Sequence, residues 1–195
     1  MAEGQDWART QFEACPDCGW DSSNVSDEEL GDAVVAACAT WPDVLADTAP
    51  DALSTRPAPS IWGALEYAGH VRDLIAIFTG RIERIRTEDD PALGWWDHEA
   101  AAVDDDYAGQ DPDSVGRDLV ANGAALAALL ADIAPGEWDR AAERRPGEGF
   151  TVRGAARFVI HEIVHHRMDA DAVIAHAMRP SGRRADDEAM GTSRE

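Results

Sequence analysis

The stretch RFVIHEIVHHRMDA, residues 157–170, decides both the predicted fold and the first functional expectation. Its apolar residues recur at the three- and four-residue spacing of an amphipathic helix. Within it, HEIVH places His161 and His165 one helical turn apart, about 40° from each other on one face, where two imidazoles can bind one ion. The same residues match the H-E-x-x-H pattern of zinc proteases, so the pair is compatible either with a protease or with another kind of metal site.

Three further segments upstream of this stretch show the same helical period. With the last one, the predicted helices span residues 26–48, 60–86, 113–133 and 151–177. Ser26 with Glu29 three residues later fits a capping box, and Thr151 fits the N-cap of the last helix. Four long helices without a strand-rich partner predict an all-α fold, a four-helix bundle with long crossover connections.

The segments between and beyond these helices predict the domain organisation. The second connection is long and acidic, and the third is rich in Gly and Pro and compatible with a short hairpin. We expect an N-terminal arm over residues 1–25, the bundle over 26–178, and a disordered C-terminal tail over 179–195.

Composition and charge exclude several classes of partner. The chain has 195 residues and a formal net charge of −21, which argues against binding nucleic acid or an anionic membrane surface. It contains no apolar run long enough to span a bilayer, and its first residues lack the pattern of a signal peptide. We therefore expect a cytoplasmic protein. Every basic residue is Arg, which is typical of a GC-rich genome and suggests an actinobacterial source.

The three cysteines do not form a disulfide framework. Cys15 and Cys18 lie in CPDCG, a spacing used by zinc knuckles and redox pairs, but the sequence has no second C-x-x-C to complete a four-cysteine site. The favoured interpretation is a structural turn, with a metal or redox role as the alternative. Cys38 lies in an apolar run and is expected in the core.

The context of HEIVH does not fit a protease. Where a metzincin would have Gly and then His, this chain has Met168 and Asp171. Asp171 also points away from the face of the histidine pair, and the sequence predicts no strand that could align a peptide. A third ligand is more plausible upstream, at His70 on the second predicted helix. The alternative for His70 is a core histidine bonded to Glu66.

A series of residues on the second and fourth predicted helices forms one pattern. It consists of Trp62, Glu66, His70 and Arg72-Asp73, followed by a long acidic connection and then by HEIVHH. In this pattern the sequence resembles the DinB/YfiT-like superfamily. The resemblance covers roughly residues 26–177. It implies a bundle that binds a divalent metal ion through His70, His161 and His165.

The resemblance also implies a class of reactions. Some family members are thiol S-transferases dependent on mycothiol or bacillithiol, so we expect a metal-dependent transfer of a low-molecular-weight thiol, such as mycothiol, to a small electrophilic substrate. A non-catalytic binding module and a metal-dependent hydrolase are the alternatives. Zinc is the first expectation for the metal, with nickel, iron and copper also compatible. A homodimer is compatible with this interpretation.

Three other residues near the expected site keep open roles. Glu162 and His166 lie about 100° off the face of His161 and His165, so an outer hydrogen-bonding role is favoured for His166. For Glu162, an outer contact or a surface ion pair with Arg is favoured over a role as general base. His98, in the long connection with Trp95, Trp96 and Tyr107, is expected either to line a pocket or to anchor the connection.

Overall fold

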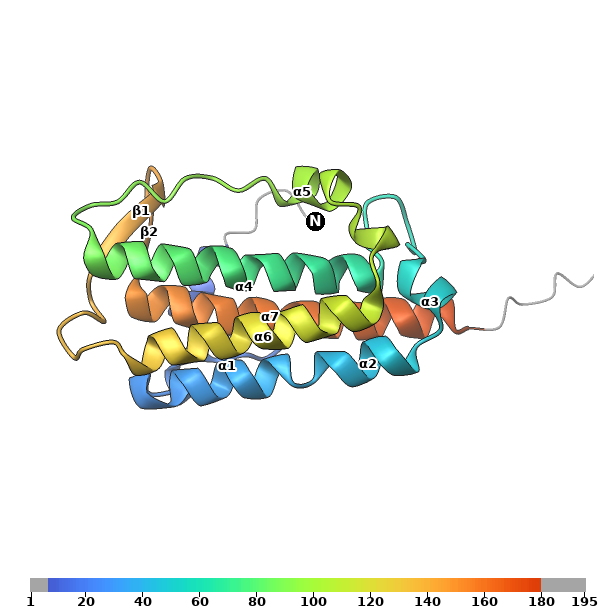
Figure 1. Ribbon diagram of the computed structural model, residues 1–195, viewed down its shortest axis with the longest axis horizontal. Helices are drawn as coiled ribbons and strands as arrows, with labels where there is room; N and C mark the ends of the chain where they lie inside the picture. Colours follow the sequence, from blue (N-terminus) through green and yellow to red (C-terminus); the bar gives the residue numbers. More distant parts are fainter. Residues whose placement is uncertain (1–6, 180–195) are drawn as a thin grey trace, which may run out of the picture.

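Four helical segments form the bundle in the computed structural model, which describes residues 7–179. The first segment is split into α1 and α2, and the other three are the long continuous helices α4, α6 and α7, which run side by side (Figure 1). The packing is closest between α4 and α7, α4 and α6, and α1 and α6. The helices are α1 (Leu30–Cys38), α2 (Trp41–Asp47), α3 (Pro50–Ser54), α4 (Ala64–Thr87), α5 (His98–Asp104), α6 (Pro112–Ala131) and α7 (Val152–Ala177).

The predicted helix over residues 26–48 is interrupted, and the sequence contains the reason. Pro42 has no backbone N–H to donate to the carbonyl of Cys38, so an α-helix cannot continue through this point. At the break, the hydroxyl of Thr40 donates to the carbonyl of Ala37 at 2.8 Å. The other three predicted helices are confirmed, with ends that differ by a few residues.

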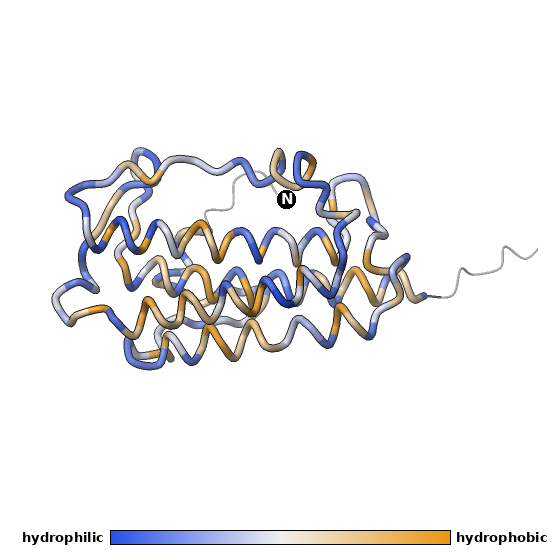
Figure 2. The backbone as a smooth tube through the Cα atoms, viewed as in Figure 1, coloured by the Kyte–Doolittle hydropathy of each residue, from blue (hydrophilic) through white to orange (hydrophobic). Residues whose placement is uncertain are grey.

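Hydrophobic side chains from all four helical segments meet in one core. Along each long helix, hydrophobic and hydrophilic positions recur in turn, as expected for helices with one buried face (Figure 2). The largest fully buried side chains include Trp41, Phe78, Leu119, Phe150 and Ile160. Cys38 is also buried, as expected, against Gly123 of α6.

The long second connection lies along the outer side of α4 and contains α5 and the 3₁₀ turn η4 (Tyr107–Gly109) (Figure 1). It is fastened by Tyr107, whose ring is fully buried and whose hydroxyl donates to Asp73 at 2.5 Å. Arg72 also donates to Gln110 at 2.6 Å. These bonds join the connection to the middle of α4.

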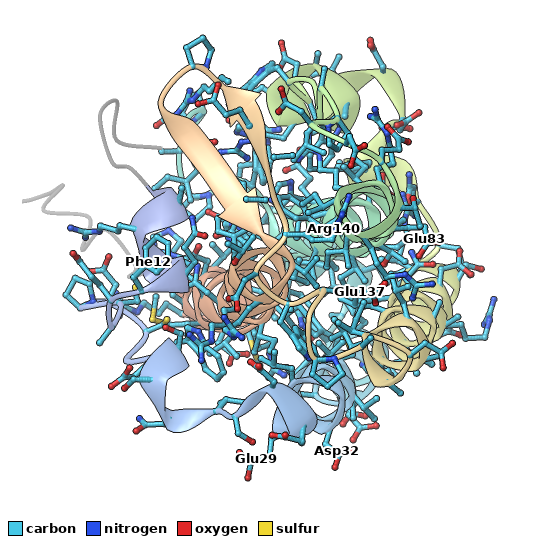
Figure 3. The ribbon with its side chains drawn as sticks, turned by 90° about the vertical axis from the view of Figure 1, so that its left-hand side faces the viewer. Phe12, Glu29, Asp32, Glu83, Glu137 and Arg140 are labelled. Carbon is cyan, nitrogen blue, oxygen red and sulfur yellow. The ribbon has the colours of Figure 1, made fainter. Side chains whose placement is uncertain are left out.

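The third connection contains a small antiparallel hairpin, β1 (Ala141–Arg145) with β2 (Glu148–Thr151). Its turn includes Gly147 at φ +81°, a conformation that favours glycine. Just before it, Arg140 donates to the carbonyl of Ile85 at 2.9 Å, and its side chain lies over the end of α4 (Figure 3). Thr151 then caps α7 by accepting a hydrogen bond from the backbone N–H of Gly154.

The predicted N-terminal arm is folded against the bundle over its described residues. It contains the 3₁₀ turns η1 (Trp7–Gln11) and η2 (Ser22–Asn24), and η1 packs on α7; a third turn, η3 (Asp27–Glu29), follows the arm and leads into α1. Gln11 donates to the carbonyl of Gly149 at 3.2 Å. The predicted disordered tail falls almost wholly on residues 180–195, which lie outside the described residues. Within 7–179, the structure has no helix that combines the length and apolar character needed to cross a membrane.

Candidate metal centres

Helix α7 carries two pairs of potential metal ligands, each pair one turn apart. His161 and His165 form one pair, and Glu162 and His166 form the other, displaced by one residue and therefore by about 100° around the helix. All four side chains are buried. The two pairs face different neighbours, and each becomes part of a separate cluster among the described residues.

The first cluster, here called the inner cluster, consists of His70, Glu162 and His166. One ligand atom from each residue lies within 4.8 Å of the other two. His70 comes from α4 and the other two residues from α7, the two helices that pack together most closely. Nε2 of His166 lies 3.5 Å from Oε2 of Glu162, and the rings of His70 and His166 are 5.0 Å apart.

Aromatic rings surround the two histidines of the inner cluster. Trp96 stacks on His70 with ring centroids 5.2 Å apart and planes only 4° from parallel. Tyr67 stacks on His166 at 5.2 Å, and Trp62 approaches His70 at the same distance. His98, at the start of α5, lies 5.6 Å from His70. The cluster is therefore bordered by aromatic residues of α4, of the segment just before α4 and of the long connection.

Burial and local hydrogen bonds set the charges in the inner cluster. Burial lowers the pKa of His70 well below its usual value, so its imidazole is neutral. Burial alone would raise the pKa of Glu162, but hydrogen bonds from His161 and His166 outweigh it and hold that pKa below its usual range. Burial opposes the charge on His166, yet bonds to Asp169 and Glu162 raise its pKa to about 9. Glu162 is thus an anion between a neutral imidazole, His70, and an imidazolium, His166, which would release its proton on binding a metal ion.

The inner cluster fits a divalent metal ion. Two imidazoles and one carboxylate are the three protein ligands of one class of catalytic zinc site, in which a further position stays open. Nδ1 of His70 is buried and has no hydrogen-bond partner among the described residues, although a buried imidazole nitrogen ordinarily has one. A metal ion bound through Nδ1 would satisfy this nitrogen.

The second cluster, here called the arm cluster, consists of Cys15, Cys18, His161 and His165. Their four ligand atoms all lie within 4.8 Å of one another. Sγ of Cys15 is 3.6 Å from Nδ1 of His165. Burial raises the pKa of Cys15, but hydrogen bonds from the backbone of Cys18 and from His161 outweigh it and leave the pKa lowered. Burial raises the pKa of Cys18 to about 11.

The two clusters touch through carboxylates. Nδ1 of His161, from the arm cluster, lies 2.9 Å from Oε1 of Glu162, from the inner cluster. Asp169 contacts both sides as well, with Oδ2 at 3.0 Å from Nδ1 of His166 and 3.6 Å from Nε2 of His165. Glu162 thus belongs to the inner cluster and bonds an imidazole of the arm cluster, whereas Asp169 bonds His166 and lies beside His165 just beyond hydrogen-bond distance.

The sequence placed His70, His161 and His165 in one site, and the structure groups them differently. It brings His161 and His165 together, but with the two cysteines, and it places His70 with Glu162 and His166. The reason is the rotation of α7, which turns residues 162 and 166 toward His70. The signal for the inner cluster was present, because Glu162 and His166 have the same four-residue spacing as the chosen pair.

The other residues named from the sequence also have defined places. Trp96 and His98 contact His70, whereas Trp95 is exposed and lies near Arg144 and Arg145. Tyr107 anchors the long connection. Thus the connection both lines the inner cluster and is fastened to the bundle.

The fold and the inner cluster together define a class: a helical bundle with a candidate metal centre between α4 and α7. The profile of the DinB superfamily matches residues 33–170, and the chain belongs to this superfamily. Among solved structures it resembles YfiT from Bacillus subtilis, with a TM-score of 0.71 and 16% identity over 78% of this chain and 89% of that one. That protein is described as a probable metal-dependent hydrolase with an unusual four-helix bundle topology. A search of curated proteins found no match.

Proposed function

We propose that the protein is a metal-dependent enzyme whose inner cluster, His70, Glu162 and His166, holds a divalent ion and which transfers a low-molecular-weight thiol to a small electrophile. The observation that carries the metal assignment is the convergence of three buried ligand atoms within 4.8 Å, from two helices. The thiol reaction rests on the resemblance of the sequence to thiol S-transferases of this superfamily. Mycothiol is the first thiol to test. The Arg-only composition is typical of GC-rich genomes and suggests an actinobacterial source, for which mycothiol is the expected thiol.

The donor set supports catalysis over storage of the ion. Three protein ligands leave a coordination position for a small molecule, whereas a site that only stabilises the fold is ordinarily closed by four. A divalent ion in this position would act as a Lewis acid and lower the pKa of a bound thiol or water. Hydrolysis is the second candidate reaction, favoured by the description of YfiT as a probable metal-dependent hydrolase.

The surrounding side chains perform three tasks in this proposal. Trp96 and Tyr67 hold the imidazoles of His70 and His166 by stacking, so both rings keep one orientation. Glu162 supplies the negative charge that a divalent ion needs in a buried place. Trp62 and Trp96 present apolar surface beside the cluster, which suits the carbon skeleton of a small electrophile.

The decisive variant is Glu162→Gln, with Glu99→Gln as its matched control. An amide oxygen is a weaker ligand and carries no charge, so we expect the affinity for the inner ion to fall by at least about 10-fold and turnover to fall with it. Glu99 lies in α5 and its side chain is 60% exposed, so its replacement should change neither. Metal content by elemental analysis and competition with a chromophoric chelator would measure both. Equal affinity in the two variants would refute the ligand assignment.

Spectroscopy of the Co(II)-loaded protein separates the reaction classes. If a thiol reaches the ion, adding mycothiol should produce an additional sulfur-to-metal absorption band in wild type that His70→Ala lacks, and the thiol should be consumed with an epoxide or haloarene. An additional band without turnover across such electrophiles would indicate a binding module. Metal-dependent ester or amide cleavage without this band would indicate the hydrolase instead.

A further inference from the structure

The CPDCG segment forms a turn that brings its two sulfurs together. The backbone N–H of Cys15 donates to the carbonyl of Trp20 at 2.8 Å, and that of Gly19 donates to the carbonyl of Cys15 at 3.0 Å. Gly19 has φ +75°, where a side chain would be strained. The sulfurs of Cys15 and Cys18 consequently lie within 4.8 Å of each other.

Helix α7 presents two imidazoles to this turn. In a tetrahedral site with metal bonds of about 2.0–2.3 Å, neighbouring ligand atoms are roughly 3.3–3.8 Å apart. The 3.6 Å between Sγ of Cys15 and Nδ1 of His165 lies in that range, and all four donors lie within 4.8 Å of one another. Two separate parts of the chain, distant by 150 residues, therefore converge as a compact set of two sulfurs and two nitrogens.

A carboxylate lies near the second ring nitrogen of each imidazole, and the one beside His161 is at hydrogen-bond distance. Glu162 faces Nδ1 of His161 at 2.9 Å, and this leaves Nε2 of that ring for the sulfurs. Asp169 faces Nε2 of His165 at 3.6 Å, and this leaves Nδ1 toward Cys15. A carboxylate that bonds the outer nitrogen of a histidine is the usual partner of a metal-binding imidazole.

We propose that Cys15, Cys18, His161 and His165 bind a structural metal ion of the zinc type, in a closed site separate from the inner cluster. Two thiolates and two imidazoles suit zinc, and four protein ligands leave no position for a substrate. The alternative, a redox-active cysteine pair, would not require two histidines aimed at the same point. This assignment does not rest on the proposed enzymatic reaction.

The ion fastens the N-terminal arm to α7. Weaker contacts lie at and just after the end of the arm: Arg157 donates to the carbonyl of Val25 at 3.3 Å, and Arg153 bonds Asp27 at 2.6 Å. Because η1 packs on α7 ahead of Cys15, the two cysteines lie between that turn and these contacts, and the ion would hold the middle of the arm. Because His161 neighbours Glu162 in the chain, the ion also fixes the rotation of α7 that turns Glu162 toward His70.

Elemental analysis of the full chain, produced in zinc-supplemented medium and purified without chelators, tests the proposal. The double variant Cys15→Ser, Cys18→Ser should lose one equivalent of metal relative to wild type, and its melting temperature should fall by roughly 10 °C. The matched control is Cys38→Ala, which removes a buried cysteine outside both clusters and should keep the full metal content. Unchanged metal content in the double variant overturns the proposal.

Cobalt substitution gives a readout that survives a poorly folding double variant. Without added thiol, the Co(II) protein should show a thiolate-to-metal band and tetrahedral visible bands, and the single variant Cys18→His, which retains four ligands, should keep the visible bands and lose about half of the thiolate band. Absence of these bands in wild type, or a disulfide-linked mass lower by two hydrogens in freshly purified protein, would overturn the proposal in favour of a redox pair.

Variants of the inner cluster distinguish the structural ion from the ion of the proposed enzymatic site. His70→Ala should leave the thiolate-to-metal band intact, because His70 does not belong to the arm cluster. One metal equivalent that is lost in the cysteine variant but kept in His70→Ala and Glu162→Gln would support the structural ion and count against the inner cluster. The reverse pattern would support the inner cluster and overturn the structural ion.

Discussion

Gly69 lies where the ring of Tyr107 packs against α4, so substituting this single residue tests that contact. A Cβ placed on Gly69 would lie 2.9 Å from the ring of Tyr107, which is fully buried and cannot retreat into solvent. We expect Gly69→Ala to lower the free energy of unfolding by about 1–3 kcal/mol through overpacking. Urea denaturation at constant metal loading would measure it.

Gly80 is the matched control in the same helix. It is exposed, and a Cβ placed there would meet no atom within 4 Å. Gly80→Ala should therefore raise the free energy of unfolding by up to about 1 kcal/mol, through helix propensity alone. If both substitutions stabilise the protein, the proposed contact between Gly69 and Tyr107 is not constraining.

The four ligand positions on α7 show how far sequence reasoning reached at this scale. The sequence predicted the helix, the metal-binding character of HEIVHH and the participation of His70, but it could not choose between two pairs displaced by one residue. That choice depends on the rotation of α7 against α4, which is set by core packing rather than by local pattern. The count of two cysteines plus two histidines could have predicted the arm cluster, but only a tertiary contact joins Cys15 to His165.

At the scale of elements, Pro42 shows a signal that was present and overlooked. The apolar period continues across residues 26–48, so periodicity alone predicts one helix, but a proline inside that period breaks the hydrogen-bond ladder. The connection over residues 88–111 is different. Its length was evident, whereas its course along α4 depends on distant bonds such as Tyr107 to Asp73.

That bond supports a prediction about the long connection. Tyr107→Phe removes the hydroxyl donor but keeps the buried ring, and Asp73 retains its ion pair with Arg72 at 2.7 Å. We expect a loss of about 1 kcal/mol in the free energy of unfolding and faster amide hydrogen exchange in α5 and η4. Hydrogen exchange followed by mass spectrometry would localise the change.

Val103→Ala is the control for the same segment. Val103 lies in α5, is 74% exposed and contributes no core packing, so its replacement should leave exchange in the connection unaltered. Equal exchange in wild type, Tyr107→Phe and Val103→Ala would show that the hydroxyl bond does not hold the connection in place.

For the whole molecule, the acidic excess predicts how stability responds to salt. With 38 acidic and 17 basic residues, repulsion among like charges outweighs attraction at long range. Raising NaCl from low concentration to about 0.5 M shortens the screening length to a few ångströms. We expect the melting temperature to rise by roughly 3 °C, which corresponds to about 1 kcal/mol for a chain of this size. Scanning calorimetry would measure this.

A fall in melting temperature with NaCl would contradict this prediction. It would mean that surface ion pairs such as Arg84 with Glu88, both about half exposed, contribute more than the acidic excess opposes. Substituting Glu88→Gln would then remove part of the salt dependence.

The distance along the chain between Cys15 and His165 has a consequence during protein synthesis. The cysteine turn leaves the ribosome 150 residues before its last histidine, an interval of roughly 8–30 s at ordinary rates of translation. Throughout that time the nascent chain carries two thiols without their imidazole partners. Oxidation in the interval would join the thiols in a disulfide, which could no longer bind a metal ion together with His161 and His165. The oxidation state of the growing chain would therefore determine whether the proposed ion can link the arm to α7.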